Sequence, residues 1–192
     1  MYAHIALIEV AVELKSDGYL DTEMDLWMEE LFVLANAAAD VLAQRLADSK
    51  QRIVLVESCT AGMAAAVLGG CPGISAWFCG SAVTYRAATK SQWLGVDQKL
   101  IEQFSAESSD TAQAMALAAL TKTPEADLAA AITGHLGPQA PVAIDGKVFM
   151  TVAFRESGEV IPFEIQLKQT ERRKRQLEAA AYLLRFAGQA LL

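Results

Sequence analysis

Hydrophobic residues recur at helical spacing between positions 24 and 47 of the chain. The apolar stripe consists of Leu31, Leu34, Ala35, Ala38, Val41, Leu42 and Leu46. This spacing predicts a long amphipathic helix. Residues 52–57 then form a continuous apolar, β-branched run, which is typical of a strand buried on both faces. Residues 63–68 predict a helix, so this part of the chain is a strand–loop–helix unit.

The remaining pattern predicts alternating strands and helices that end in a hairpin. We expect strands at about 76–85 and 127–133, a helix at 111–121 that Ser108 caps, a β-hairpin of 147–156 with 160–167, and a last helix at 171–192. This order predicts an α/β protein: a single three-layer α/β/α domain with a mixed, mostly parallel sheet. We assign that domain to 29–192 and treat 1–28 as an N-terminal extension, in which 5–14 predict a strand or short helix and 16–18 a turn.

The charge of the chain argues against binding to nucleic acid. Its formal net charge is −7 at pH 7, and phosphate contacts need clustered Lys and Arg. One basic cluster, at 172–175, opens the last predicted helix. We interpret it as a solvated first turn, with contact to an anion or to a second subunit as the alternative.

Cysteine and histidine content indicates a protein of a reducing compartment without a structural metal. The three cysteines form no CxxC pair, and the only histidines, His4 and His135, lack ligand spacing. Glu9 and Glu13 interrupt the short apolar run at the N-terminus, which predicts neither a signal peptide nor a membrane span. We therefore expect a cytoplasmic protein that needs no cofactor.

Two polar, glycine-bearing loops follow predicted strands, one after Glu57 and one after Thr133. In α/β sheets, sites lie beyond the carboxyl ends of the strands. Ser58 is the first candidate, because a serine between a strand and a helix N-terminus can attack while nearby N–H groups stabilise an oxyanion. The alternative is that Ser58 or Thr60 only caps the helix.

A serine nucleophile needs a base, and the sequence offers two kinds. His4 and His135 lack an obvious carboxylate partner, so a Ser-His-Asp triad is poorly supported. A desolvated lysine can also accept the proton, and Lys90 follows a predicted strand end closely. From its position alone, Lys90 could equally be a surface lysine.

A series of motifs runs through most of the chain. The motifs begin with Glu57-Ser58-Cys59-Thr60-Ala61-Gly62, continue with Pro72-Gly73-x-Ser75-Ala76-Trp77-Phe78, Val83-Thr84-Tyr85 before Lys90 and Leu94-Gly95-Val96, and end with Ser108, Ala126-Asp127-Leu128-Ala129 and Thr133-Gly134-x-x-Gly137-Pro138. Taken together they resemble the C-terminal domain family of CinA, the competence- and damage-inducible protein. The resemblance covers about residues 30 to 192. The family's longer form carries a further N-terminal domain, and we expect a stand-alone version here.

The resemblance implies an amidohydrolase that converts nicotinamide mononucleotide into nicotinic acid mononucleotide and ammonia, in pyridine nucleotide salvage. It implies Ser58 as nucleophile, Lys90 as base and Tyr85 as the group that orients them. Further substrate-binding candidates are the N–H groups of Thr60, Ala61 and Gly62 for an oxyanion, and Ser108, Thr133, Gly134, Gly137 and Arg175 for the nucleotide. The resemblance also favours a homo-oligomer, with no membrane or nucleic-acid partner.

Two motifs depart from the family pattern. The usual TGIAGPxGG is replaced by Thr133-Gly134-His135-Leu136-Gly137-Pro138-Gln139-Ala140-Pro141, which loses two glycines and adds His135, interpreted as an exposed loop residue. The Gly-Asp-Arg before the last helix is replaced by Lys168-Gln169-Thr170-Glu171-Arg172, and Arg172 and Arg175 are the candidates to take the place of its arginine. Three interpretations follow: an active nicotinamide-nucleotide amidase, a serine amidohydrolase with another amide substrate, or a catalytically inactive paralogue that binds a nucleotide or a partner.

Overall fold

The computed structural model describes residues 22–138 and 140–192. The strand or helix expected at 5–14 and the turn at 16–18 lie outside these residues. Helix α2 (Thr22–Ser49) contains the predicted stripe and runs without a break past residue 28. The boundary that we drew between 28 and 29 therefore falls inside this helix.

Five strands form one sheet in the order β2-β1-β3-β4-β5. Their bounds are β1 (Ile53–Glu57), β2 (Phe78–Val83), β3 (Leu128–Gly134), β4 (Lys147–Phe154) and β5 (Val160–Gln166). The first three strands of that order are mutually parallel, and β4 is antiparallel to both β3 and β5. Because β4 alone runs against the others, the sheet is mixed and mostly parallel, as the sequence predicted.

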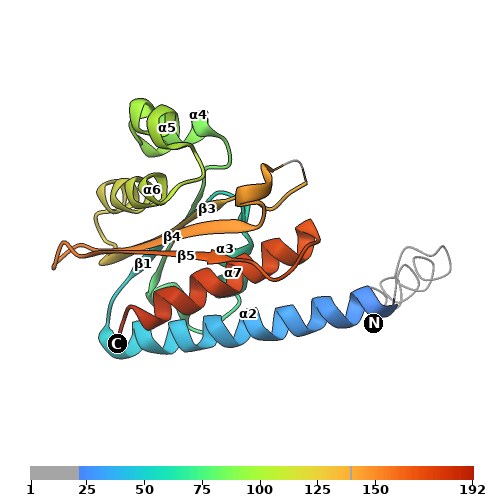
Figure 1. Cartoon of the computed structure of the whole chain (residues 1–192). Helices are drawn as coiled ribbons and strands as arrows, with labels where there is room; N and C mark the ends of the chain where they lie inside the picture. The colour runs from blue at the N-terminus through green and yellow to red at the C-terminus, as the bar shows by residue number, and fades with distance from the viewer. Residues whose placement is uncertain (1–21, 139) are drawn as a thin grey trace, which may run out of the picture.

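Helices cover both faces of this sheet (Figure 1). On one face lie α2, α3 (Met63–Gly69) and α7 (Arg172–Gln189), and on the other lie α5 (Gln98–Phe104) and α6 (Ser109–Lys122). Alternate residues of β1 enter two separate cores, Leu55 with α2 and α7, and Val56 with α6. The three-layer α/β/α prediction is confirmed.

Short helical segments join these layers. They are η1 (Ile74–Ala76), α4 (Ala87–Thr89), the π-helical turn η2 (Lys90–Leu94) and η3 (Val142–Ile144). The hydrophobic pattern predicted neither these nor α5, because three to seven residues are too few for a periodic pattern to emerge. The turn η2 matters most for the site, because Lys90 is its first residue.

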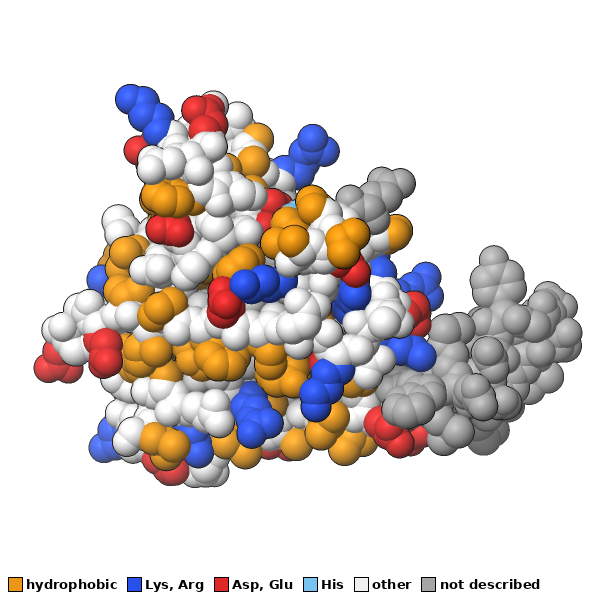
Figure 2. Space-filling model, in the orientation of Figure 1, with side chains coloured by type: hydrophobic (Ala, Val, Ile, Leu, Met, Phe, Trp, Pro, Cys, Tyr) orange, Lys and Arg blue, Asp and Glu red, His pale blue; other side chains and the backbone are white. Residues whose placement is uncertain are grey.

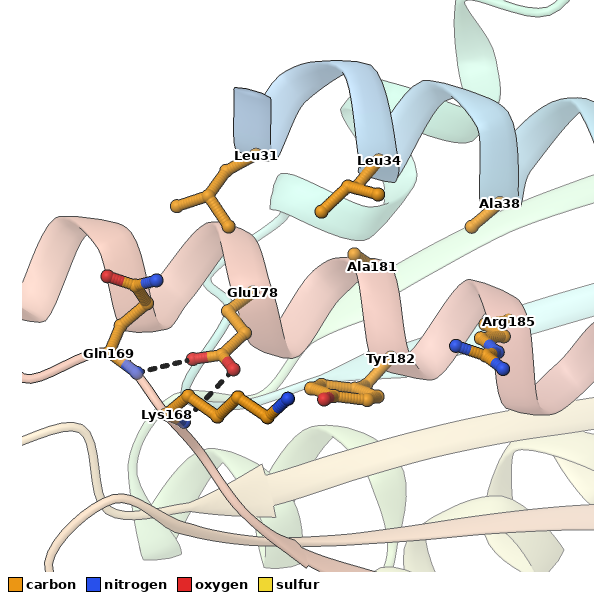
Figure 3. A pocket seen from close by; sticks show the side chains of 9 residues that line it. All are labelled: Leu31, Leu34, Ala38, Lys168, Gln169, Glu178, Ala181, Tyr182 and Arg185. Carbon is orange, nitrogen blue, oxygen red and sulfur yellow. Dashed lines mark hydrogen bonds between the residues drawn. The ribbon is translucent and has the colours of Figure 1, made fainter. Parts of the chain in front are cut away.

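Helices α2 and α7 pack side by side, with Leu42 against Gly188. A cavity of about 240 Å³ remains between them, lined by Leu31, Leu34 and Tyr182 among others (Figure 3). In this cavity the Glu178 carboxylate accepts hydrogen bonds from the backbone N–H groups of Lys168 and Gln169, at 3.0 and 2.9 Å. Glu178 therefore holds the chain where it approaches α7.

On the face that Figure 2 shows, Lys and Arg side chains are interspersed with Asp and Glu side chains, and hydrophobic groups lie between them. Phe163 on β5 is an exposed hydrophobic residue that stacks on Phe186 of α7, with ring centroids 5.0 Å apart. Within the described part of the chain, none of the helices has the length and apolar character that crossing a membrane requires.

Candidate active site

Ser58 and Lys90 lie together, although they are far apart in the sequence. The Lys90 Nζ donates a hydrogen bond to Ser58 Oγ at 2.8 Å. Ser58 directly follows β1 at its carboxyl end and is 4% exposed, while Lys90 is fully buried. The structure therefore gives Lys90 a buried position and not a surface one, and it gives Ser58 a partner beyond any capping role.

The position of Lys90 is set by the backbone that precedes it. Its Nζ also donates to the carbonyl oxygen of Thr84 at 3.0 Å, and Thr84 N–H donates to Glu57 O at 2.8 Å, which extends the pairing of β1 with β2. Burial lowers the pKa of Lys90 from its ordinary value, and the negative charge of Glu107 opposes this shift. A buried amine with a lowered pKa is suited to accept a proton from a neighbouring hydroxyl.

The loop after β1 has fewer free backbone N–H groups than the sequence predicted. The buried Glu57 carboxylate accepts from the N–H groups of Gly62, Ala64 and Ala65 and from Ser81 Oγ, at 2.9 to 3.1 Å. It thus occupies the N-terminus of α3, where a negative charge is favourable. The Ala61 N–H donates to Ser58 O. The predicted oxyanion role therefore does not suit Ala61 or Gly62, since their N–H groups are already used.

Thr60 is also held from within the protein. Its carbonyl oxygen accepts a hydrogen bond from Gln176 Nε2 at 2.8 Å, which ties the loop to α7. Its buried hydroxyl has no hydrogen-bond partner in the described part of the chain. The N–H groups of Cys59 and Thr60 donate to no backbone or side-chain oxygen among the described residues. Both N–H groups interact with the Cys59 sulfur, which is a weak acceptor, so they remain candidates for binding an oxyanion.

Cys59 adjoins Ser58 and lines the same cavity, so its reactivity matters. Burial raises the pKa of this thiol to about 12, against an opposing effect of the Lys90 charge. The thiolate is the nucleophilic form of cysteine, and it is scarcely populated near neutral pH at such a pKa. Ser58 is the better candidate for the nucleophile, because its hydroxyl is hydrogen-bonded to Lys90, a possible base.

A cavity of about 290 Å³ opens over Ser58. Tyr85, Arg172 and residues of the loop after β3 form part of its lining. Arg172 donates to the Tyr85 hydroxyl at 2.5 Å and also to the Gly137 carbonyl oxygen. Tyr85 thus lies at the predicted site, but its hydrogen bond joins it to Arg172 and not to the Ser58–Lys90 pair.

Arg175 has a structural position instead of the predicted substrate-binding one. It is 5% exposed, pairs with both carboxylate oxygens of Asp145 at 2.7 and 2.9 Å, and donates to Gln169 O. This pairing lowers the pKa of Asp145. The basic cluster is therefore divided: Arg175 is buried, Arg172 reaches the cavity and Arg173 is exposed. The simple interpretation as a solvated turn is wrong for Arg175.

Two further predicted residues, Ser108 and Thr133, fix loops. The Ser108 hydroxyl accepts from Thr111 N–H at 3.1 Å, which makes it the N-cap of α6 as predicted. The Thr133 hydroxyl donates to Ala106 O at 2.8 Å. Neither residue is among those that line the cavity. Thr133 thus holds the loop before α6 against the end of β3, while Ser108 fixes the start of α6.

Gly134 and Gly137 do line the cavity. At Gly134 a Cβ atom would lie 2.5 Å from the carbonyl oxygen of Lys147, so the approach of β4 requires glycine. At Gly137, with φ of 62°, a Cβ atom would lie 2.9 Å from both Arg175 and Asp145. The closeness of the protein's own groups thus explains both glycines.

One acidic residue of the cavity, Glu107, was not singled out from the sequence. Its Oε2 lies 3.7 Å from His135 Nε2 and accepts from Ser105 Oγ at 3.2 Å. The His135 side chain is 27% exposed and lines the cavity, so it is not a freely exposed loop residue. Its position on a polar loop before a helix was the sequence feature that could have identified Glu107 as a site residue. Carboxylates are common on such surface loops, so this feature is not specific.

These features accompany a clear family match. Residues 35–189 match the family model described as CinA C-terminal domain. The chain belongs to the CinA C-terminal domain family. A CinA-like protein of Mycobacterium marinum is 40% identical over 154 residues, covering 77% of this chain and 35% of the relative. One from Mycolicibacterium vanbaalenii is 38% identical over 167 residues, covering 85% of this chain and 39% of the relative. The chain thus spans little more than a third of the length of these relatives.

Solved structures of CinA superfamily members share the fold. A CinA superfamily protein from Klebsiella pneumoniae has a TM-score of 0.76 at 25% identity, covering 82% of this chain and 97% of that one. The competence/damage-inducible protein from Agrobacterium tumefaciens has a TM-score of 0.76 at 28% identity, covering 82% of this chain and 95% of that one. The resemblance inferred from the motifs is therefore confirmed at the level of family and fold.

Proposed function

We propose that this protein is a serine amidohydrolase that converts nicotinamide mononucleotide into nicotinic acid mononucleotide and ammonia. The single observation that carries the proposal is the 2.8 Å contact between Lys90 Nζ and Ser58 Oγ below a polar cavity. Membership of the CinA C-terminal domain family supports the choice of substrate. The chemistry requires only groups that this site contains.

In the first half-reaction Lys90, in its neutral form, takes the proton of the Ser58 hydroxyl. The amine can donate to Thr84 O while its lone pair faces Ser58 Oγ. Oγ then forms a bond to the carboxamide carbon, and the carbonyl oxygen becomes an oxyanion. Lys90 returns the proton to the amide nitrogen as the C–N bond breaks, which releases ammonia and leaves an ester on Ser58.

In the second half-reaction water takes the place that ammonia has left. Lys90 removes a proton from that water, and the oxygen attacks the ester carbon. The bond to Ser58 Oγ breaks, and Oγ recovers the proton from Lys90. The sum is amide plus water to carboxylic acid plus ammonia, so Ser58 and Lys90 end as they began. The N–H groups of Cys59 and Thr60 are our candidates for stabilising the oxyanion in both steps.

Arg172 is our candidate for binding the substrate phosphate. It lines the cavity over Ser58 and also an adjoining cavity of about 740 Å³. A guanidinium group can bind two phosphate oxygens in a forked geometry. Arg175, already paired with Asp145, lacks this freedom. The assignment leaves the amide near Ser58 and the phosphate toward the outside.

Ammonia release from nicotinamide mononucleotide tests the proposal. The unchanged chain should release ammonia, while Ser58→Ala and Lys90→Ala should each reduce the rate at least about a thousandfold. Lys90→Arg is the matched control for charge: it keeps a cation but cannot act as a base near neutral pH, so it should also be inactive. Full activity in Ser58→Ala or Lys90→Ala would refute the dyad.

The same assay separates the proposed reaction from the two other interpretations. Release of ammonia from another carboxamide, but not from this nucleotide, would indicate a different substrate. Binding of the nucleotide without release would indicate an inactive paralogue. A cytoplasmic location and a homo-oligomer are also part of the proposal. All three cysteines are free, which suits a reducing compartment, and light scattering on the purified protein measures its assembly.

A further inference from the structure

The cavity over Ser58 carries a separated pair of opposite charges. Among its described lining residues, Glu107 alone bears a carboxylate and Arg172 alone a guanidinium. These side chains come from the loop before α6 and from the first turn of α7. A ligand with both a cationic and an anionic part would match this arrangement better than a ligand of one sign.

Hydrogen bonding holds the Glu107 side chain in place but occupies one of its two carboxylate oxygens. Its Oε2 accepts from Ser105 Oγ and lies near His135, while Oε1 has no hydrogen-bond partner within the described residues. Its side chain is 28% exposed. The loop is fastened to β3 by the hydrogen bond from Thr133 Oγ1 to Ala106 O. One carboxylate oxygen is therefore available on a loop that is fixed relative to Ser58.

We propose that Glu107 is a specificity-determining residue that selects a substrate whose ring is cationic. This inference rests on the proposed function, because the ring of nicotinamide mononucleotide is a pyridinium whose nitrogen carries the sugar. The positive charge lies in the same ring that bears the carboxamide, so it must enter the cavity with the amide. A partly desolvated carboxylate in that cavity stabilises such a ring and gives no comparable gain to a neutral one.

The protonation state of Lys90 also changes the charge balance of the site. The Glu107 charge acts on Lys90 through space, so the two groups belong to one electrostatic environment. When Lys90 is neutral, as the mechanism needs, Glu107 lacks that cation as a counterion. A pyridinium ring then supplies the missing positive charge as the substrate binds.

Binding of two forms of the substrate tests the inference. Nicotinamide mononucleotide and its reduced dihydro form have nearly the same shape and phosphate, but only the former has a cationic ring. Dissociation constants are measured calorimetrically in a Ser58→Ala background, which prevents turnover. Adding Glu107→Gln should weaken binding of the oxidised form about tenfold and that of the reduced form less than twofold.

Two further variants test whether a loss of affinity comes from the charge of Glu107 itself and not from any change at this position or in the net charge of the protein. Glu107→Asp keeps the charge and should retain most of the preference for the oxidised form. Glu102→Gln removes one charge from α5, where Glu102 bonds Gln98 on the surface, and should leave both constants unchanged. Unchanged melting temperatures confirm that the compared variants are folded.

The possible failures are distinguishable. Equal weakening of both forms by Glu107→Gln, or no weakening of either, would overturn the role of Glu107 while leaving the proposed amidase intact. Failure of Ser58→Ala to bind the oxidised form, together with no turnover by the unchanged chain, would overturn the proposed function and with it this inference. A selective loss for the oxidised form supports both.

Discussion

The carbonyl oxygen of Thr84 accepts a hydrogen bond from Lys90 Nζ at 3.0 Å, and both residues are fully buried. A backbone carbonyl cannot take up or lose charge near neutral pH, so it orients the amine without competing for its proton. Among the described residues, the other hydrogen bond of the amine is with Ser58 Oγ at 2.8 Å. Thr84 thus fixes the position of the amine that we propose as the base.

The pH dependence of turnover should report on Lys90. Burial lowers the pKa of Lys90 while the Glu107 charge raises it, and the proposed mechanism requires the neutral amine. The rate constant kcat should therefore fall as pH decreases through that pKa. In Glu107→Gln the raising influence is absent, so the acidic limb of the kcat profile should move to lower pH. A limb that stays in place, or moves to higher pH, would contradict the assignment.

Replacing Arg172 should impair binding more than chemistry. Its guanidinium joins Tyr85 to Gly137 across the cavity and is our candidate for the phosphate. Arg172→Ala should raise KM for the nucleotide about tenfold or more, with a smaller change in kcat. Arg173→Ala is the matched control, since Arg173 is exposed on the same turn of α7 and should leave KM unchanged. Steady-state kinetics on both variants decides the point.

Glu57 should be a structural residue despite its place next to Ser58. Its carboxylate accepts four hydrogen bonds in a fully buried position. Glu57→Gln removes the charge and replaces one acceptor oxygen with an NH2 donor that faces other donors, so it should lower the free energy of unfolding by about 2–4 kcal/mol. Urea unfolding measures this, with the exposed Glu156→Gln as control. A loss of less than half a kcal/mol would show that the contacts are replaceable.

Gly134 should not tolerate a side chain. A Cβ atom would lie 2.5 Å from Lys147 O and 2.7 Å from Val148 Cα, and both belong to a paired strand that cannot withdraw. Gly134→Ala should therefore destabilise the fold by about 1–3 kcal/mol. Gly69→Ala, where nothing lies within 4 Å of the new atom, should be neutral or slightly stabilising. Thermal unfolding of the two variants makes the comparison.

Periodic segments and strand ends were predictable because their signals are local. The stripe in α2, the buried run of β1 and the hairpin of β4 with β5 all appear where the pattern placed them. Ser108 was likewise found as the N-cap of α6. Each of these features depends on the residue types within one element, which the chain itself displays.

Other assignments depended on what lies across space. No local pattern could show that the Glu57 carboxylate takes the N–H groups of α3, or that Arg175 pairs with Asp145 while Arg172 reaches the cavity. Adjacent residues of one type acquire different roles because the helix turns each toward different neighbours.

The sequence by itself thus determined the layers, the family and the candidates for the catalytic residues. Only the tertiary structure decided that Lys90 is buried against Ser58, that Cys59 keeps its proton, and that Glu107 enters the same cavity. The physical reason is that reactivity depends on desolvation and on distances between groups from different elements. Those quantities arise only when the sheet and its connecting loops are assembled.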